Sequence, residues 1–309
     1  NANFNWVGKR KLFYLISGIV IAAGIISIAI RGLNFGVDFT GGRSYLVNFE
    51  QTNDINKVGD ALENVFISES GLNMRPTVKT YGTSNQVNII TKYLIDDESE
   101  NVEEKVELKL NEGLSSLGSK YTIEWSRKVG ATVAEDLKRD AILAVIFALL
   151  TIFVYILFRF KSWQFGAGAT LALFHDVMIV ISIFSIFYGI FPFSLEVDLD
   201  FIAAILTVVG YSINDTVVVF DRIREFIGRY KRRERKELIN SALNSTLGRT
   251  INTSLTTLFV LIMMFIFGGE VIRGFCFALI VGITAGTYSS LGIATPIIVD
   301  FTKEEKSEP

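Results

Sequence analysis

Six long apolar runs divide this sequence, with polar segments between them. A helix needs about 20 mostly apolar residues to cross the hydrocarbon core of a bilayer, and each run is about that long. The pattern therefore predicts a polytopic α-helical membrane protein with six transmembrane helices. The predicted spans cover residues 12–30, 141–158, 165–191, 199–220, 250–267 and 274–300.

Between the first two spans the pattern changes to that of a soluble domain. Residues that alternate between apolar and polar predict strands, and residues that repeat every three or four positions predict helices. The resulting order, βαββαβ, is typical of a ferredoxin-like α+β domain, a fold that serves many functions. The predicted strands are 43–49, 74–81, 86–93 and 120–129, with a hairpin turn at 82–85, and the predicted helices are 54–66, with Asp54 as its N-cap, and 99–117.

Composition supports this division of the chain. Half of the residues are hydrophobic and 20% are charged, which is too apolar for an ordinary soluble domain. The predicted organisation is an N-terminal end with the first helix (1–34), an external ferredoxin-like domain (35–135), helices two to six with a basic cytoplasmic loop at 221–249 (136–302), and a cytoplasmic tail (303–309).

The distribution of basic residues predicts the orientation. Lysines and arginines precede the first span, separate the second from the third, and crowd the segment 222–249. Short basic loops face the cytoplasm, so both termini are expected inside and residues 35–135 outside. Within the basic segment, 236–247 has an amphipathic pattern that predicts a helix lying on the inner membrane surface and leading edge-on into the fifth span.

Asp215 is the most informative polar residue, because it lies deep in the fourth span. A charged side chain at a helix centre costs about 2.5 to 3.5 kcal/mol, so such a residue is expected to have a function. Polar residues on spans four and five fall on one face of each helix, and two antiparallel helices can bring such faces together. The fourth span offers Thr207, Tyr211, Asn214 and Asp215, and the fifth offers Arg249, Asn252, Thr253, Thr256 and Thr257.

In that arrangement the guanidinium of Arg249 would compensate the carboxylate of Asp215. A pair whose separation changes would control the protonation of the acid, and it would act as a proton relay. The alternative interpretation is that Arg249 extends to the inner headgroups and that Asp215 meets penetrating water.

Two further features lie inside the spans. His175 and Asp176 interrupt the third span near mid-membrane, as a second polar site or as a helix-packing contact. Adjacent residues project about 100° apart on a helix, so the two are expected to serve different neighbours. Gly282 and Gly286 give the sixth span a face for close helix packing.

The sequence does not favour an enzyme. It has no phosphate-binding loop, one histidine and one cysteine, Cys276, and no metal-ligand spacing. We therefore expect no catalytic residues, no metal site, no cofactor and no nucleic-acid partner.

Three segments together resemble the SecD and SecF protein-export membrane proteins. They are the membrane-exit signature at 35–42, the fourth-span motif at 209–225 and the fifth-span segment at 249–257. The resemblance covers nearly the whole chain. It places Asp215 and Arg249 at the ion-coupling positions of the family, and it identifies Asp38, Gly41 and Gly42 as the signature of the membrane exit, where the structural interpretation is a turn.

The resemblance implies a half-transporter of the resistance-nodulation-division type in the bacterial inner (plasma) membrane. Its expected partners are SecD, fused or separate, the SecYEG channel, YidC as a further candidate, the preprotein and membrane lipids. The chain begins with Asn1, which fits the second half of a SecD–SecF fusion. The implied function is to use the proton or sodium motive force to promote preprotein export and release on the external side.

Two other functions stay open at the level of sequence. A half-transporter for small hydrophobic molecules or lipids would share the polar faces and the fold, although an external domain of about 110 residues leaves little room for a substrate tunnel. A receptor whose external domain binds a ligand would leave Asp215 without a role.

Overall fold

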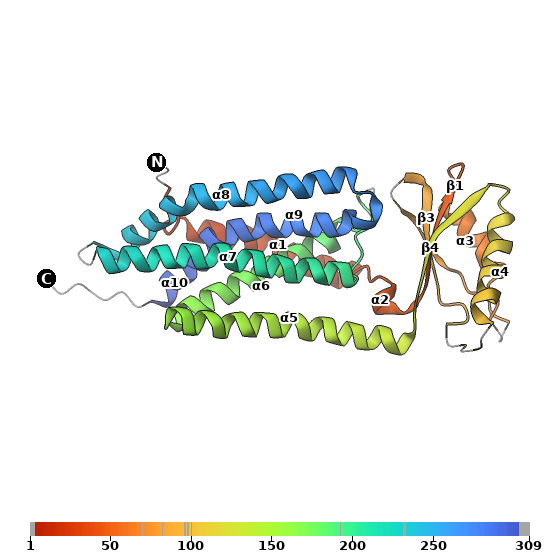
Figure 1. The fold of residues 1–309 in the computed structure, drawn as a ribbon, viewed down its shortest axis with the longest axis horizontal. Helices are drawn as coiled ribbons and strands as arrows, with labels where there is room; N and C mark the ends of the chain where they lie inside the picture. The colour runs from red at the N-terminus through yellow and green to blue at the C-terminus, as the bar shows by residue number, and fades with distance from the viewer. Residues whose placement is uncertain are drawn as a thin grey trace.

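A helical bundle and a sheet domain lie end to end along the long axis of the computed structural model (Figure 1). The first and the last described residues lie at the pole of the bundle remote from the sheet. The polypeptide is described for residues 4–68, 71–81, 83–95, 97, 99, 101–191, 193–230 and 233–302. The predicted tail at 303–309 lies outside these residues.

The prediction of six membrane-spanning helices is confirmed by length and composition. The sixth span consists of three segments, because a π-helical turn interrupts it. The spans are α1 (Arg10–Arg31), α5 (Ala131–Phe160), α6 (Trp163–Phe187), α7 (Leu199–Arg229), α8 (Arg235–Phe267), and α9 (Glu270–Ser289) followed by η1 (Ser290–Ala294) and α10 (Thr295–Phe301).

Several helices are longer than their apolar runs. Helix α5 starts ten residues before its predicted span, and α7 continues through the charged residues to Arg229. Much of the segment 221–249 that was predicted as a loop is therefore helical. Hydropathy marks only the part of a helix that contacts lipid, whereas backbone hydrogen bonding continues into water wherever the sequence allows it.

The prediction that 236–247 lies on the membrane surface is wrong. This segment is the first part of α8 and continues into the fifth span without a break. Its apolar face, with Ile239, Ala242 and Leu243, packs into the protein core instead of facing lipid. Asn240 and Asn244 accept hydrogen bonds from the backbone of the N-terminal segment, at 3.0 Å each.

The domain between the first two spans, called the sheet domain from here on, has the predicted ferredoxin-like topology. Its four strands pair antiparallel in the order β2-β3-β1-β4. Figure 1 shows the two long helices of the domain on the side of the sheet away from the bundle. The elements are α2 (Val37–Thr40), β1 (Gly42–Phe49), α3 (Ile55–Glu63), β2 (Thr77–Tyr81), β3 (Thr83–Thr91), α4 (Val102–Ser115) and β4 (Tyr121–Val129).

Local signals account for most of these elements. Asp54 is the N-cap of α3, as predicted, and its side chain accepts a hydrogen bond of 2.8 Å from the backbone of Asn56. The hairpin is tighter than predicted, because Tyr81 already pairs with Thr83. Gly82, in the predicted turn, lies outside the described residues. Both helices are shorter than predicted, since the flanking turns end them early.

Two apolar clusters fill the bundle, one toward the chain termini and one toward the sheet domain. The first includes Phe13, Phe160 and Phe220, and the second includes Phe184 and Phe201. Buried polar side chains separate the clusters along the bundle, near the middle of the spans. They include Ser17, His175, Asp176, Ser212, Asp215, Thr216, Ser254 and Ser289.

The packing face predicted on the sixth span is present. A Cβ atom on Gly282 would lie 2.2 Å from a methyl group of Val208 on α7, so only glycine allows this approach. We expect Gly282→Ala to lower the free energy of unfolding by about 1 to 3 kcal/mol, the usual cost of overpacking. Thermal unfolding in detergent would measure the change.

Gly18→Ala on α1 is the matched control, since no atom lies within 4 Å of the added Cβ there. Equal melting temperatures for the two variants would show that the α7–α9 contact is not tight.

Candidate functional site

Asp215 lies in the layer of polar side chains between the two apolar clusters. Its helix, α7, buries one face that includes Ser212, Thr216 and Val219, and Asp215 is on the same side. The residue is only 5% exposed, and its Oδ2 atom has no hydrogen-bond partner among the residues that the structure describes. Buried polar atoms in proteins are nearly always satisfied, so an unpartnered carboxylate oxygen is a candidate site for a proton or a cation.

Arg249 is exposed and does not contact the acid. Among the described residues no ion pair within 4.0 Å joins Arg249 to Asp215. The guanidinium is nevertheless close enough for its charge to act on the carboxyl group. The predicted ion pair between Asp215 and Arg249 is thus absent from this conformation, although the two side chains are near each other.

The polar faces of α7 and α8 do meet, through Tyr211. Its hydroxyl donates a hydrogen bond of 3.0 Å to the carbonyl oxygen of Thr253 and lies 3.2 Å from Oγ1 of Thr257. Ser254 is close to Asp215, but its hydroxyl bonds to Thr287 on α9 at 2.6 Å. The structure therefore brings the two predicted faces together one turn away from the acid.

The remaining residues of the predicted site point away from this chain. Asn214 on α7 is exposed, as are Asn252 and Thr256 beside Arg249 on α8. Hydrocarbon is a poor environment for amide and guanidinium groups, so a face of this composition in the membrane requires a polar cover. The face forms one continuous border to the buried Asp215, and we call it the α7–α8 polar face.

The second predicted polar site is a hydrogen-bonded pair. His175 Nδ1 lies 2.9 Å from Oδ1 of Asp176. The two residues do have different neighbours, as expected, since His175 contacts Ser17 on α1 and Asp176 contacts α7 and α9, but the sequence did not predict the contact between them. Oδ2 of Asp176 accepts hydrogen bonds from Ser212 on α7 (2.6 Å) and from Ser289 on α9 (2.8 Å).

The pair extends toward α1 through two hydroxyl groups. His175 Nε2 lies 2.8 Å from Oγ of Ser17, which lies 3.2 Å from the hydroxyl of Tyr288. The Tyr288 hydroxyl donates to the carbonyl oxygen of Phe13 at 2.8 Å. The π-helical turn η1 begins directly after Ser289, and turns of this kind are frequent at functional sites.

Sequence reasoning missed the hydroxyl-bearing residues of both sites. Ser17 is a single polar position in an apolar helix, whereas Ser212, Ser254 and Tyr288 lie among other polar residues that do not single them out. A helical-period analysis centred on His175 and Asp215, extended to every serine and threonine in the spans, would have selected some of them. It would not have identified partners, since those lie on helices far apart in the sequence.

Asp38 fixes the membrane exit. The side chain is 3% exposed, and its two oxygens lie 3.1 and 3.2 Å from the guanidinium of Arg127 on β4. Oδ2 also accepts a hydrogen bond of 3.1 Å from the backbone of Leu199, the first residue of α7. One carboxylate thus joins the sheet domain to the helix that carries Asp215.

Gly41 and Gly42 form the predicted turn, preceded by the short helix α2. Their φ angles of +67° and +132° are in the region that favours glycine. A Cβ on Gly42 would lie 3.0 Å from the carbonyl oxygen of Thr91, so the turn also needs the absence of a side chain.

A second link holds the domain to the loop before α7. Lys79 on β2 donates to Oδ1 of Asn34 at 2.7 Å and forms an ion pair of 3.2 Å with Glu196. The backbone of residues 34–36 pairs with Val197 through hydrogen bonds of 2.8 and 3.0 Å. The α6–α7 loop is therefore the anchor of the sheet domain.

Asp198 makes this junction sensitive to pH. Burial, together with the nearby charges of Asp200, Glu196 and Asp38, raises its pKa from 3.8 to about 6, against a hydrogen bond from the backbone of Phe201. Because the folded junction holds the proton more tightly than the unfolded chain, its stability should fall as pH rises from about 4 to about 6 and then stay constant.

Hydrogen exchange of the peptide 193–201, corrected for the intrinsic rate, would measure this loss of protection. Asp198→Asn keeps the cap of α7 and should remove the pH dependence. If hydrogen exchange in Asp198→Asn still depended on pH in the same way, a group other than Asp198 would be responsible.

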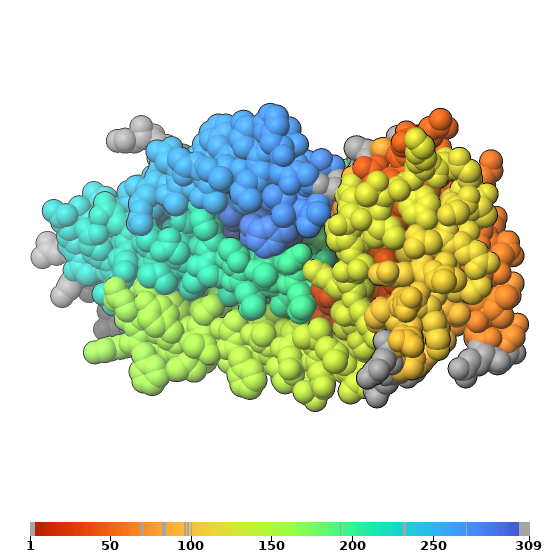
Figure 2. Space-filling model, turned by 45° about the vertical axis from the view of Figure 1, so that its right-hand side comes forward, coloured from red at the N-terminus to blue at the C-terminus, as the bar shows by residue number. Residues whose placement is uncertain are grey.

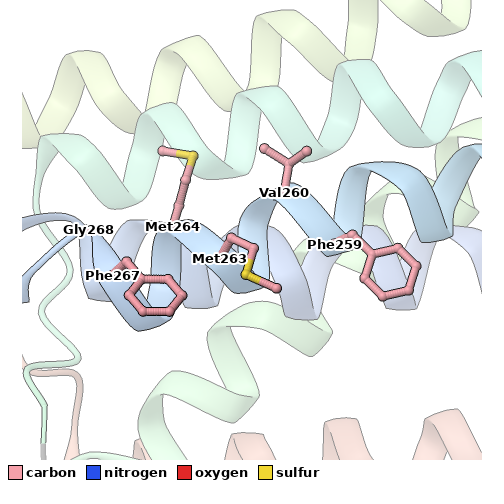
Figure 3. Close-up of a pocket in the computed structure, with 6 residues that line it drawn as sticks. All are labelled: Phe259, Val260, Met263, Met264, Phe267 and Gly268. Carbon is pink, nitrogen blue, oxygen red and sulfur yellow. The ribbon is translucent and has the colours of Figure 1, made fainter.

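An apolar hollow of about 540 Å³ lies on α8. Figure 3 shows that its lining side chains all come from one stretch of this helix, so it is a surface depression and not an enclosed tunnel. In the space-filling view, α8 and α7 flank a part of α9 that stays visible (Figure 2). The lining residues are Phe259, Val260, Met263, Met264, Phe267 and Gly268.

Fold and site together define a class: a multi-pass α-helical membrane protein with acids buried between its spans and one extramembrane sheet domain. Two family models match the chain. The C-terminal model of the SecD/SecF protein export membrane proteins covers residues 109–304, and the SecD/SecF GG motif covers residues 26–52. The chain belongs to the SecD/SecF family of protein-export membrane proteins.

Within the family the chain is similar to SecF. It is 44% identical over 300 residues to protein translocase subunit SecF of Rhodothermus marinus, covering 97% of this chain and 94% of that one. A crystal structure of SecDF from Thermus thermophilus, described as a translocon-associated membrane protein, matches with a TM-score of 0.83 and 33% identity. A crystal structure of SecDF in a super-membrane-facing form matches with a TM-score of 0.67 and 33% identity.

Each SecDF match covers 97% of this chain and 39% of the SecDF chain. The chain thus spans well under half of SecDF and nearly the full length of the SecF relative. Its general role is in protein translocation, as a membrane subunit; the relatives are named as translocase subunits.

Proposed function

We propose that this chain couples movement of a proton or sodium ion at Asp215 to the export of preproteins, together with a SecD half. The single observation that carries the proposal is the state of Asp215. It is a buried acid with an unpartnered oxygen, beside a guanidinium that acts on it without contact. Such a site can bind a cation and release it when Arg249 approaches.

The partner is inferred from the α7–α8 polar face. Asn214, Arg249, Asn252 and Thr256 lie open at the border of the site, and this chain covers 39% of the matched chain, which is named SecDF. A SecD half covering this face would complete the environment of Asp215. The SecYEG channel and YidC are proposed further partners on the basis of the family role alone.

The proposed orientation is that both termini face the cytoplasm and the sheet domain faces outward from the bacterial inner membrane. The basic segments support it, because they gather at the pole of the bundle where the termini lie. In this orientation the contacts of Asp38 and Lys79 would transmit a shift of α7 to the sheet domain.

Preprotein export by membrane vesicles tests the proposal. Vesicles that lack the chain should lose the part of export that depends on the ion gradient, and adding the full chain with its SecD half should restore it. Collapsing the proton or the sodium gradient separately identifies the ion. Export that stays independent of both gradients would contradict the proposal, and gradient-driven movement of a lipophilic dye in its place would favour the small-molecule alternative.

A further inference from the structure

The His175–Asp176 pair is a second buried titratable unit, separate from Asp215. Asp176 is fully buried and accepts three hydrogen bonds, from His175, Ser212 and Ser289. Among the described residues no lysine or arginine lies within 4.0 Å of it. In this conformation its charge is therefore compensated by a proton, either on the imidazole or on the carboxyl group itself.

The direction of the hydrogen bonds fixes the proton count. A carbonyl oxygen only accepts, so the bond to Phe13 uses the single hydroxyl hydrogen of Tyr288. Ser17 must then donate to Tyr288, and His175 Nε2 must donate to Ser17. With Nε2 protonated, the bond between Nδ1 and Asp176 requires one more proton shared between these atoms.

We propose that the His175–Asp176 pair is a proton-binding site that exchanges one proton and reports its occupancy to α1. In the occupied state, one proton lies on Nε2 and another between Nδ1 and Oδ1 of Asp176, so the pair is neutral overall. On release, the proton on Nε2 leaves, Nδ1 keeps its proton toward Asp176, and the pair carries one negative charge.

The hydroxyl groups rotate when the proton leaves. Ser17 then donates to the bare Nε2, Tyr288 donates to Ser17, and the carbonyl oxygen of Phe13 loses the hydrogen bond from Tyr288. The only covalent bond that breaks is the Nε2–H bond of His175. One proton and one positive charge leave the pair, so atoms and charge balance. The change links α6 to α1 and α9, while Ser212 and Ser289 hold Asp176 in place.

The surroundings contain few competing groups. The Tyr288 ring is 6.0 Å from the imidazole, and Asp215 is one helical turn along α7 from Ser212. Apart from Asp215, several charged side chains on the elements packed against α6 have partners toward the helix ends. These pairs are Arg10 with Asp300 and Arg159 with Asp221, at 2.9 Å each, while Arg31 donates to the carbonyl oxygen of Ile186.

His175 is the only histidine of the chain, which makes the test direct. The full chain, labelled with nitrogen-15 histidine and carrying a tag without histidine, is reconstituted in lipid and observed by NMR. As the pH is raised across the range in which the chain stays folded, we expect the imidazole to lose one proton, with Nε2 losing its proton and Nδ1 keeping the one toward Asp176.

Asp176→Asn should abolish this pattern, because the amide cannot share the proton. Ser17→Ala is the milder variant in case Asp176→Asn does not fold, and it should move the Nε2 signal while Nδ1 stays bonded. Asp215→Asn is the control, and in this variant His175 should still lose its Nε2 proton. A negative result for the His175–Asp176 pair can therefore be told apart from a negative result for ion coupling at Asp215. A single protonation state over the whole range, or loss of the Nδ1 proton first, would overturn the proposal.

Discussion

Replacing Asp215 by asparagine should abolish gradient-dependent export while leaving the chain folded and assembled. Asparagine has nearly the same shape but takes up no proton and carries no charge. One charge moved through about 100 mV contributes about 2.3 kcal/mol, equivalent to a bias of about 50-fold between two states. We expect export to fall to the rate measured without a gradient, because this bias is lost.

The measurement is preprotein export in vesicles with and without the gradient. Asp140→Asn is the matched control, since it makes the same chemical change at a side chain that is 63% exposed near the start of α5. Arg249→Met should resemble Asp215→Asn, because it removes the charge that acts on the acid. Normal gradient dependence in either site variant would refute ion coupling at Asp215.

Replacing Asp38 by alanine should disconnect the sheet domain from α7. The substitution removes the ion pair with Arg127 and the acceptor for the backbone of Leu199. Hydrogen bonds to a charged group are each worth about 1.5 to 3 kcal/mol, so the junction loses a large part of its local stability. We expect faster hydrogen exchange at 36–42 and 197–201 and a loss of export, with the bundle intact.

Asp136→Ala is the control for this second result. It removes an acid that pairs with Arg139 at 3.3 Å on the surface of α5, where both side chains are exposed, and surface pairs contribute little. Arg127→Ala should give a weaker version of the Asp38 effect, because the bond from Leu199 remains. Unchanged exchange at the α7 start in Asp38→Ala would show that the domain is held by the Lys79 contacts instead.

The two variants test different steps. Asp215→Asn tests ion coupling at the buried acid, and Asp38→Ala tests the link from α7 to the sheet domain. Asp215→Asn should leave exchange at the junction as it is, since the junction contacts lie at the start of α7, far along the helix from the acid. Asp38→Ala should leave the environment of Asp215 as it is. If each variant changed both the hydrogen exchange at the junction and the environment of Asp215, the bundle and the sheet domain would behave as one rigid unit.

Much of the architecture follows from local signals in the sequence. Continuous apolar runs specify the six spans, because lipid requires both apolar side chains and satisfied backbone groups. Strand alternation and the Asp54 cap specify the sheet domain, since each element has its own periodicity. Asp215 stood out as a site candidate, because acids are rare in an apolar helix.

The tertiary structure alone decided what these polar groups do. It placed Asp215 without Arg249 in contact, it turned His175 toward Asp176, and it joined Asp38 to Arg127, 89 residues away. Sequence periodicity gives the face of a helix on which a residue lies, but side-chain conformation and the choice of neighbouring helix depend on packing of the whole bundle. Hydrogen-bond partners on distant segments are fixed only when that packing is complete.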